Sequence, residues 1–108
     1  MEESKPTEQT IVDGIKFPSR KQANRYLELR MMERAGEIIE LEMEKTIPLI
    51  VGGYLICKYR CDFVYAKTYR HPDGTGVVWE DAKGYRTREY QIKMKLVKAL
   101  YGIEILET

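Results

Sequence analysis

Cysteine and histidine are scarce in this chain, and their spacing does not suit a zinc site. The 108 residues include two cysteines, Cys57 and Cys61, and one histidine, His71. Within a strand, the two cysteines would stand roughly 13 Å apart at about 3.3 Å per residue, which is too far for a disulfide. No Cys-x-x-Cys pair is present, so structural zinc is disfavoured. We expect two reduced thiols in the core.

Long apolar runs are also missing. No stretch approaches the ~18 residues of a membrane span, and the first ten residues, MEESKPTEQT, are polar where a secretory signal would be apolar. We therefore expect no membrane partner and a cytoplasmic location. A chain of this length suits one core, so the expected organisation is a flexible tail over 1–10 and a single domain over 11–108.

An overall charge bias is absent, but the charges are segregated along the chain. Lysine and arginine number 18 against 17 acidic residues, so any attraction to nucleic acid must be local. Between residues 83 and 98 there are six basic residues and one acidic residue, whereas glutamates crowd the segment from 33 to 44. The sequence thus predicts a polarised surface.

Turn and capping signals predict an α/β domain with a mixed sheet and the order α-β-β-β-α-β. Ser19 is a suitable N-cap and Gly36 a suitable stop for a first helix, whose apolar stripe would hold Ala23, Tyr26, Leu27 and Met31. A charged connector would follow it. The expected strands are 46–51, 54–65, 76–83 and 103–107, with a basic amphipathic helix over 87–100 before the last strand. The third and fourth strands would then be parallel.

The third strand ends in charges that the period of a strand divides between two faces. Asp81 and Lys83 share one face with Trp79, while Glu80 takes the other. In an antiparallel pair, the residue numbers of facing residues add to a constant that the centre of the turn determines. With the turn signal HPDG at 71–74, that sum is 143–145. Asp62 then falls opposite Asp81 or Lys83.

Two carboxylates and a lysine on one face suit a hard divalent cation. Mg²⁺ takes one or two carboxylates from a protein and completes its shell with water and substrate phosphate. An adjacent lysine could position the attacking water or stabilise charge on the phosphate. Spacing alone leaves a surface charge cluster equally open.

The order of the motifs adds a resemblance. An Asp on one strand, followed by Asp81-Ala82-Lys83 at the end of the next and then a helix, resembles the PD-(D/E)xK nuclease superfamily. The chain also resembles a family of small, phage-encoded, uncharacterised proteins assigned to that superfamily. The resembling segments are FPSRKQANRYLELRMMERAGEI, YRCDFVY, VVWEDAKGYRT and KMKLVKALYGIEILE. They span nearly all of the chain from Ile15 onward, and the implied fold is a restriction-endonuclease-like core.

The resemblance also implies roles for particular residues. Asp62 and Asp81 would be ligands of Mg²⁺ or Mn²⁺, joined by the backbone carbonyl of Ala82, and Lys83 would be the catalytic lysine. Glu80, on the opposite face, would be a structural acid, although a one-residue bulge would exchange its role with that of Asp81.

The first helix departs from the family pattern. Related phage proteins carry Ser-x-x-Glu-Ala where this chain has Ser19-Arg20-Lys21-Gln22-Ala23. Gln22 could reach the ion only through water, and it removes one negative charge. Glu28 is an alternative acid, but it lies about 240° further round the helix. The departure puts turnover in question.

The resemblance implies an endonuclease that hydrolyses DNA and leaves 5′-phosphate and 3′-hydroxyl ends. Arg86, Thr87, Arg88 and Lys95 are the expected DNA contacts, because charge and a helix N-terminus attract phosphate. A domain of this size favours nicking or structure-selective cutting, and two-strand cutting would need a homodimer. Two alternatives stay open: a DNA-binding module of the same fold with little catalysis, and an interaction protein in which the charges form salt bridges.

Overall fold

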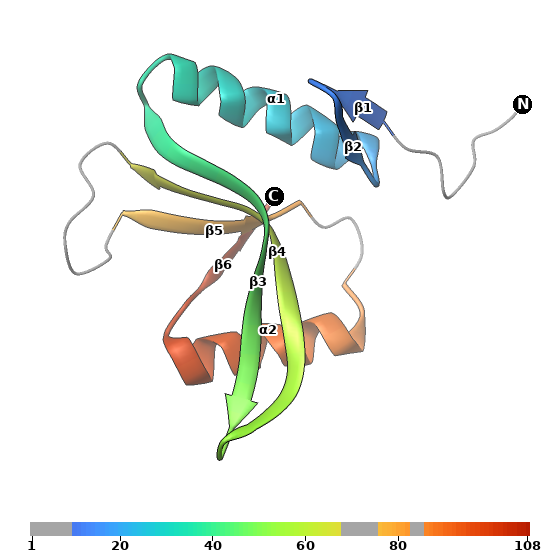
Figure 1. Ribbon diagram of the computed structural model, residues 1–108, viewed down its shortest axis with the longest axis vertical. Helices are drawn as coiled ribbons and strands as arrows, with labels where there is room; N and C mark the ends of the chain where they lie inside the picture. Colours follow the sequence, from blue (N-terminus) through green and yellow to red (C-terminus); the bar gives the residue numbers. More distant parts are fainter. Residues whose placement is uncertain (1–9, 68–75, 83–85) are drawn as a thin grey trace, which may run out of the picture.

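A computed structural model describes residues 10–67, 76–82 and 86–108. Eight elements follow one another in the chain (Figure 1): β1 (Thr10–Val12), β2 (Ile15–Phe17), α1 (Arg20–Arg34), β3 (Ile38–Val51), β4 (Tyr54–Lys67), β5 (Val77–Asp81), α2 (Arg88–Tyr101) and β6 (Ile105–Glu107). The HPDG turn at 71–74 and residues 1–9 of the expected tail lie outside the described residues. No helix within the described ranges is long and apolar enough to cross a membrane.

The main sheet has four strands in the order β3-β4-β5-β6. The first two pairs are antiparallel, and β5 and β6 are parallel. The single domain with a mixed sheet is therefore confirmed, as is the unit in which α2 connects two parallel strands. Parallel neighbours require such a crossover, because a tight turn cannot join them.

A short hairpin before α1 was not predicted. Strands β1 and β2 pair with each other, and Asp13 and Gly14 between them have φ angles of 53° and 77°. An Asp-Gly pair with both residues at positive φ suits a tight hairpin turn. Thr10, which we assigned to the tail, begins this hairpin. Figure 1 shows the hairpin beside the first turns of α1.

The first helix begins where the sequence predicts but buries only part of the predicted stripe. The Ser19 side chain accepts the backbone N–H of Gln22 at 3.1 Å, which satisfies one of the helix's unpaired donors. Leu27 and Met31 are 42% and 67% exposed, whereas Leu29 is fully buried. Ala23 and Tyr26, which belong to the same predicted stripe, are buried as expected. The prediction was therefore correct for the first half of the helix and wrong for Leu27 and Met31.

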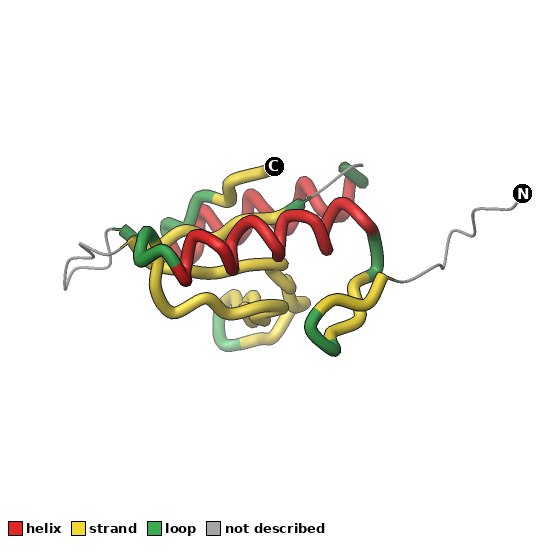
Figure 2. Tube along the Cα trace, turned by 90° about the horizontal axis from the view of Figure 1, so that it is seen from above, coloured by secondary structure: helices red, strands yellow, loops and turns green. Residues whose placement is uncertain are grey.

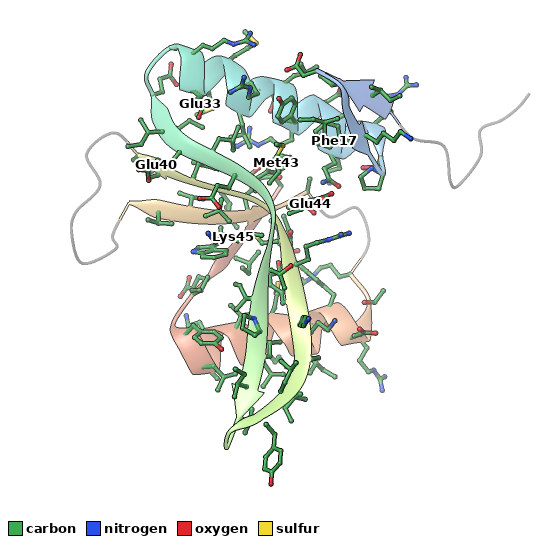
Figure 3. All side chains as sticks on the ribbon, viewed as in Figure 1. Phe17, Glu33, Glu40, Met43, Glu44 and Lys45 are labelled. Atoms are coloured by element: carbon green, nitrogen blue, oxygen red, sulfur yellow. The ribbon has the colours of Figure 1, made fainter. Side chains whose placement is uncertain are left out.

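The predicted charged connector is in fact the first half of β3. Ile38 is buried, and Leu41 and Met43 pack against the same cluster. Glu40 and Glu44, both labelled in Figure 3, have φ angles of 58° and 55°, and the register with β4 shifts near the first of them. From Ile39 to Glu44 apolar and acidic residues alternate, and the glutamates are exposed. This is the period of a strand, and the density of glutamate led us to assign a connector instead.

Two clusters of buried residues form the core. The α1 cluster consists of Phe17, Ala23, Tyr26, Leu29, Ile38, Phe63, Tyr65 and Ala82. The α2 cluster consists of Ile47, Leu49, Tyr59, Cys61, Val64, Tyr90 and Val97. Figure 1 shows the two helices lying across opposite ends of the long β3–β4 hairpin, and Figure 2 shows the same strands from above.

Strand β5 contributes to both clusters. Val78 packs on the α1 cluster, and Val77 and Trp79 pack on the α2 cluster. Alternate residues of β5 therefore face the two helices in turn, as the strand period requires. This strand carries the charged end from which the candidate site is built.

Candidate active site at the ends of the central strands

The two predicted aspartates meet at the ends of adjoining strands. Strands β4 and β5 pair Phe63 with Glu80 and Val64 with Trp79, so facing numbers add to 143, as the turn argument allowed. In the next position, the Asp62 backbone N–H donates to Asp81 Oδ1 at 2.8 Å. The Ala82 N–H donates to Asp62 Oδ2 at 3.0 Å. The pairing of residues 63–66 with residues 77–80 contains no bulge, so Asp81 and Glu80 keep their separate faces.

Both aspartates are withdrawn from solvent. Asp81 is fully buried and Asp62 is 9% exposed. The hydroxyl of Tyr59 donates to Asp81 Oδ2, so each oxygen of Asp81 accepts a hydrogen bond. Burial raises the pKa of Tyr59, and the neighbouring Asp81 carboxylate raises it further. The phenol therefore stays protonated and remains a donor to the carboxylate.

Glu80 faces α1 and is held in a separate buried network. Its carboxylate accepts from Arg25 through Nε and Nη2, from the Tyr65 hydroxyl at 2.7 Å and from the Thr108 hydroxyl at 3.1 Å. Burial acts to raise the pKa of Glu80, but the bonds from Arg25 and Tyr65 outweigh it and lower the pKa below 4.5. These contacts tie Glu80 to α1 and to β4.

Sequence reasoning missed Arg25 and Tyr59, which are the side-chain partners of the two buried acids of β5. Arg25 lies 55 residues from Glu80 in sequence. Arg25 lies one turn of α1 after Gln22, the position at which related proteins carry an acid. That spacing was the only signal in the sequence that Arg25 lies near the site. Tyr59 shares the odd-numbered face of β4 with Cys61, which identified it as a core residue and no more.

The auxiliary residues on α1 do not form an acidic site. Gln22 is 5% exposed and lies among the buried residues of the helix. The Glu28 side chain is 64% exposed and pairs with Arg25 Nη1 at 2.9 Å. Lys83 lies outside the described residues, so the geometry of the expected catalytic lysine stays a prediction.

The four expected DNA contacts have different surroundings. Arg86 pairs with Glu107 at 3.3 Å, and Thr87 caps α2 by accepting the Tyr90 N–H at 3.0 Å. Arg88 is exposed. Lys95 lines a separate groove between α2 and β6. The structure therefore distributes these residues over more than one surface.

The carboxylate oxygens at the strand ends are the type of ligand that a hard cation binds. Within the described ranges, no group of three or more His, Cys, Asp or Glu side chains is arranged to hold a metal ion. Asp62 and Asp81 nevertheless supply two carboxylates at adjoining positions. Mg²⁺ accepts such a small protein contribution when phosphate and water complete its shell, and a carboxylate oxygen that accepts one hydrogen bond keeps a second lone pair.

Comparison with known proteins gives a single match. A family model described as "Protein of unknown function (DUF1064)" matches residues 4–105. No curated protein and no solved structure matches the chain. The family match covers most of the chain, including α1, β4 and β5, which carry the candidate site.

Proposed function

We propose that this chain, which belongs to the DUF1064 family, is a Mg²⁺- or Mn²⁺-dependent endodeoxyribonuclease with a restriction-endonuclease-like core. The observation that carries the proposal is the meeting of Asp62 and Asp81 at the ends of β4 and β5. The resemblance of Asp81-Ala82-Lys83 to the nuclease motif supports the same conclusion. The enzyme would act on phage DNA in the host cytoplasm.

Each residue of the site would have its own role in catalysis. Asp62 and Asp81 would hold the ion, with the Ala82 carbonyl as a further oxygen donor. When bound, the ion would neutralise charge on the phosphate and lower the pKa of the attacking water. Lys83 would orient that water or stabilise charge that develops on the phosphate. Tyr59 keeps the Asp81 carboxylate in place through its hydroxyl.

The fixed position of the acids supports catalysis by preorganisation. Both carboxylates are bound to the backbone of the neighbouring strand, so little ordering is needed before substrate arrives. The small surface of the domain favours nicking or the recognition of branched DNA over the reading of a long sequence. A homodimer would be required to cut two strands at once.

A cleavage assay tests the proposal. Supercoiled and four-way-junction DNA would be incubated with Mg²⁺ or Mn²⁺ and the wild type, Asp81→Asn or Lys83→Ala. We expect nicking by the wild type and a loss of at least about 100-fold in each variant, because removal of one transition-state donor costs that much. The control is Glu104→Gln, which removes an exposed carboxylate paired with Lys98. Cleavage that survives both site substitutions contradicts the assignment.

A second candidate is a DNA-binding module of the same fold with little catalysis. Two observations favour it: Gln22 is neutral, and Asp81 is fully buried with each oxygen already accepting a hydrogen bond. The same assay separates the candidates when it is accompanied by a binding measurement. DNA binding without cleavage under either metal selects the binding module, and the absence of both activities rejects both candidates.

A further inference from the structure

A cavity of about 520 Å³ opens between α1 and the ends of β5 and β6. Its lining includes Arg20, Lys21, Asn24 and Arg25 from the helix, with Ala82 and Thr108 from the strand ends. The helical residues are spaced by one, three and four positions, so they form one face of the first two turns. Figure 1 shows the end of β6 reaching the side of the sheet on which α1 lies.

The charge of this lining is mainly positive. Arg20, Lys21 and Arg25 face one acidic lining residue, Glu28. The Arg25 guanidinium is fixed from below by the buried carboxylate of Glu80, so its position does not depend on a ligand. A planar, fixed guanidinium beside the side chains of Arg20 and Lys21 is an arrangement suited to an oxygen-rich anion.

The beginning of α1 is unfavourable unless an anion is near. The first turn contains Arg20 and Lys21 and no acidic residue, although the positive end of a helix favours acids there. By contrast, α2 places Glu89 in its first turn. Two cations that cost stability at this end of α1 are explained if they serve binding, since functional sites are where local preferences are violated.

The cavity opens at the strand end that carries Asp81, and one of its lining residues is hydrogen-bonded to Asp62. Ala82 lines it, and the Ala82 N–H donates to Asp62 Oδ2 at 3.0 Å. Ala82 and Thr108 also immediately follow the parallel strands β5 and β6, and ligands of α/β sheets bind beyond the carboxyl ends of such strands. A phosphate in this cavity would therefore lie beyond the same strand ends as the two aspartates, on the face of β5 that carries Glu80.

We propose that this cavity binds a phosphate of the nucleic-acid backbone, with Arg20 and Lys21 as its main contacts and Arg25 as a fixed third cation. The choice of nucleic acid rests on the proposed nuclease function, whereas the affinity for phosphate rests on the cavity itself. Glu28 opposes the anion and limits its affinity. The main backbone contact is thus on α1, where sequence analysis expected none.

Binding is measured by fluorescence anisotropy in EDTA, with a labelled duplex and a labelled four-way junction. EDTA removes cleavage, so the result does not depend on turnover. The double variant Arg20→Gln/Lys21→Gln is compared with Lys16→Gln/Lys58→Gln, which removes the same charge at two exposed positions outside the cavity. The thermal midpoint of each variant confirms that it is folded.

We expect the α1 double variant to bind at least about 10-fold more weakly at low salt. For duplex DNA, the slope of log K against log[salt] should fall by about 0.9, since each neutralised phosphate contributes about 0.9 and the cavity would bind one. The control should lose little affinity and keep its slope. Equal losses in the two double variants would overturn the proposal, because general charge would then account for binding.

Glu28→Gln supplies a test in the opposite direction. Removing the one acid of the lining should tighten DNA binding by about 2- to 5-fold at low salt, and an unchanged or weaker affinity contradicts its assigned role. Competition with inorganic phosphate and with a mononucleotide separates the two sources of the anion. If either one binds through Arg20 and Lys21 while DNA affinity does not depend on them, the site is for free phosphate and the proposal fails.

Failure of this proposal is distinguishable from failure of the nuclease proposal. Loss of binding in the α1 variant without cleavage by the wild type supports the cavity and rejects the enzyme. Cleavage by the wild type with unchanged binding in the α1 variant supports the enzyme and rejects the cavity.

Discussion

The carboxylate of Asp81 accepts the backbone N–H of Asp62 at 2.8 Å, and Asp62 in turn accepts the N–H of Ala82 at 3.0 Å. Two side chains thereby continue the hydrogen bonding between β4 and β5 beyond the last paired residues. Each carboxylate has a structural task as well as the proposed metal-binding one. Substitutions at these positions must therefore be chosen so that the two tasks are separated.

Asp81→Ala should destabilise the fold far more than Asp81→Asn. Alanine leaves the Asp62 N–H and the Tyr59 hydroxyl without their acceptor, and each buried donor left unpaired costs about 1–3 kcal/mol. Asparagine keeps an oxygen for the Asp62 N–H, and the Tyr59 hydroxyl can accept from its amide. We expect Asp81→Ala to lower the free energy of unfolding by about 2–5 kcal/mol and Asp81→Asn by under about 2 kcal/mol. Urea denaturation measures both values. Equal losses would show that charge, and not hydrogen bonding, holds Asp81.

Glu80 should determine part of the acid sensitivity of the fold. Its pKa in the folded protein lies below the ordinary value of 4.5, so its stabilising effect is complete above pH 4.5 and is lost as the pH falls through the lowered pKa. Glu80→Gln should cost about 2–3 kcal/mol at pH 7, less than for a fully buried pair because the Arg25 side chain is 24% exposed. The difference from wild type should shrink toward pH 3 in urea unfolding.

A matched control for Glu80 is Glu104→Gln. Glu104 forms an ion pair with Lys98, but its side chain is 74% exposed, and exposed pairs contribute little to stability. We expect the unfolding curves of this variant to follow the wild type at every pH. If acid destabilises Glu80→Gln as much as the wild type, groups other than Glu80 determine the acid sensitivity of the fold.

The features that were correct in sequence analysis depend on local signals. Ser19 and Thr87 cap the two helices, and Gly102 ends the second at a φ angle of 70°. The spacing of the HPDG turn limited the residue opposite Asp62 to Asp81 or Lys83, and the register of β4 and β5 corresponds to Asp81. Each of these signals is contained within a few residues or one turn, so the sequence alone can carry it.

The features that were missed depend on packing between distant segments. Arg25 and Glu80 are 55 residues apart, and nothing in either neighbourhood indicates the other. The first half of β3 was missed for a different reason: its alternation of apolar residues and glutamates is visible in the sequence, but the density of charge was given more weight than the period. The cation-lined cavity exists only because α1 lies beside the ends of β5 and β6. Such contacts arise from the whole fold and leave no periodic signal.

The two cysteines should differ sharply in reactivity. Both are free; Cys61 is fully buried, whereas Cys57 is partly accessible. Burial raises the pKa of the Cys61 thiol to about 12, and the nearby Asp81 carboxylate adds to the shift. Because the thiolate is the reactive form, we expect one thiol to react with a disulfide reagent at pH 8 and the second only after unfolding. Cys57→Ser should abolish the fast reaction; fast labelling of that variant would contradict the burial of Cys61.

Gln22→Glu should make the stability of the protein depend on Mg²⁺. Gln22 is 5% exposed, so a carboxylate at this position loses most of its hydration and should cost about 1–3 kcal/mol in EDTA. If the position faces the proposed ion, bound Mg²⁺ stabilises the folded state, and the variant should gain more in thermal midpoint than the wild type. Gln91→Glu, at an exposed position of α2, is the matched control and should respond to Mg²⁺ as the wild type does. An equal gain in thermal midpoint for the two variants would show that residue 22 does not contact the ion. The replacement of the family's Glu by Gln22 would then not account for weak catalysis.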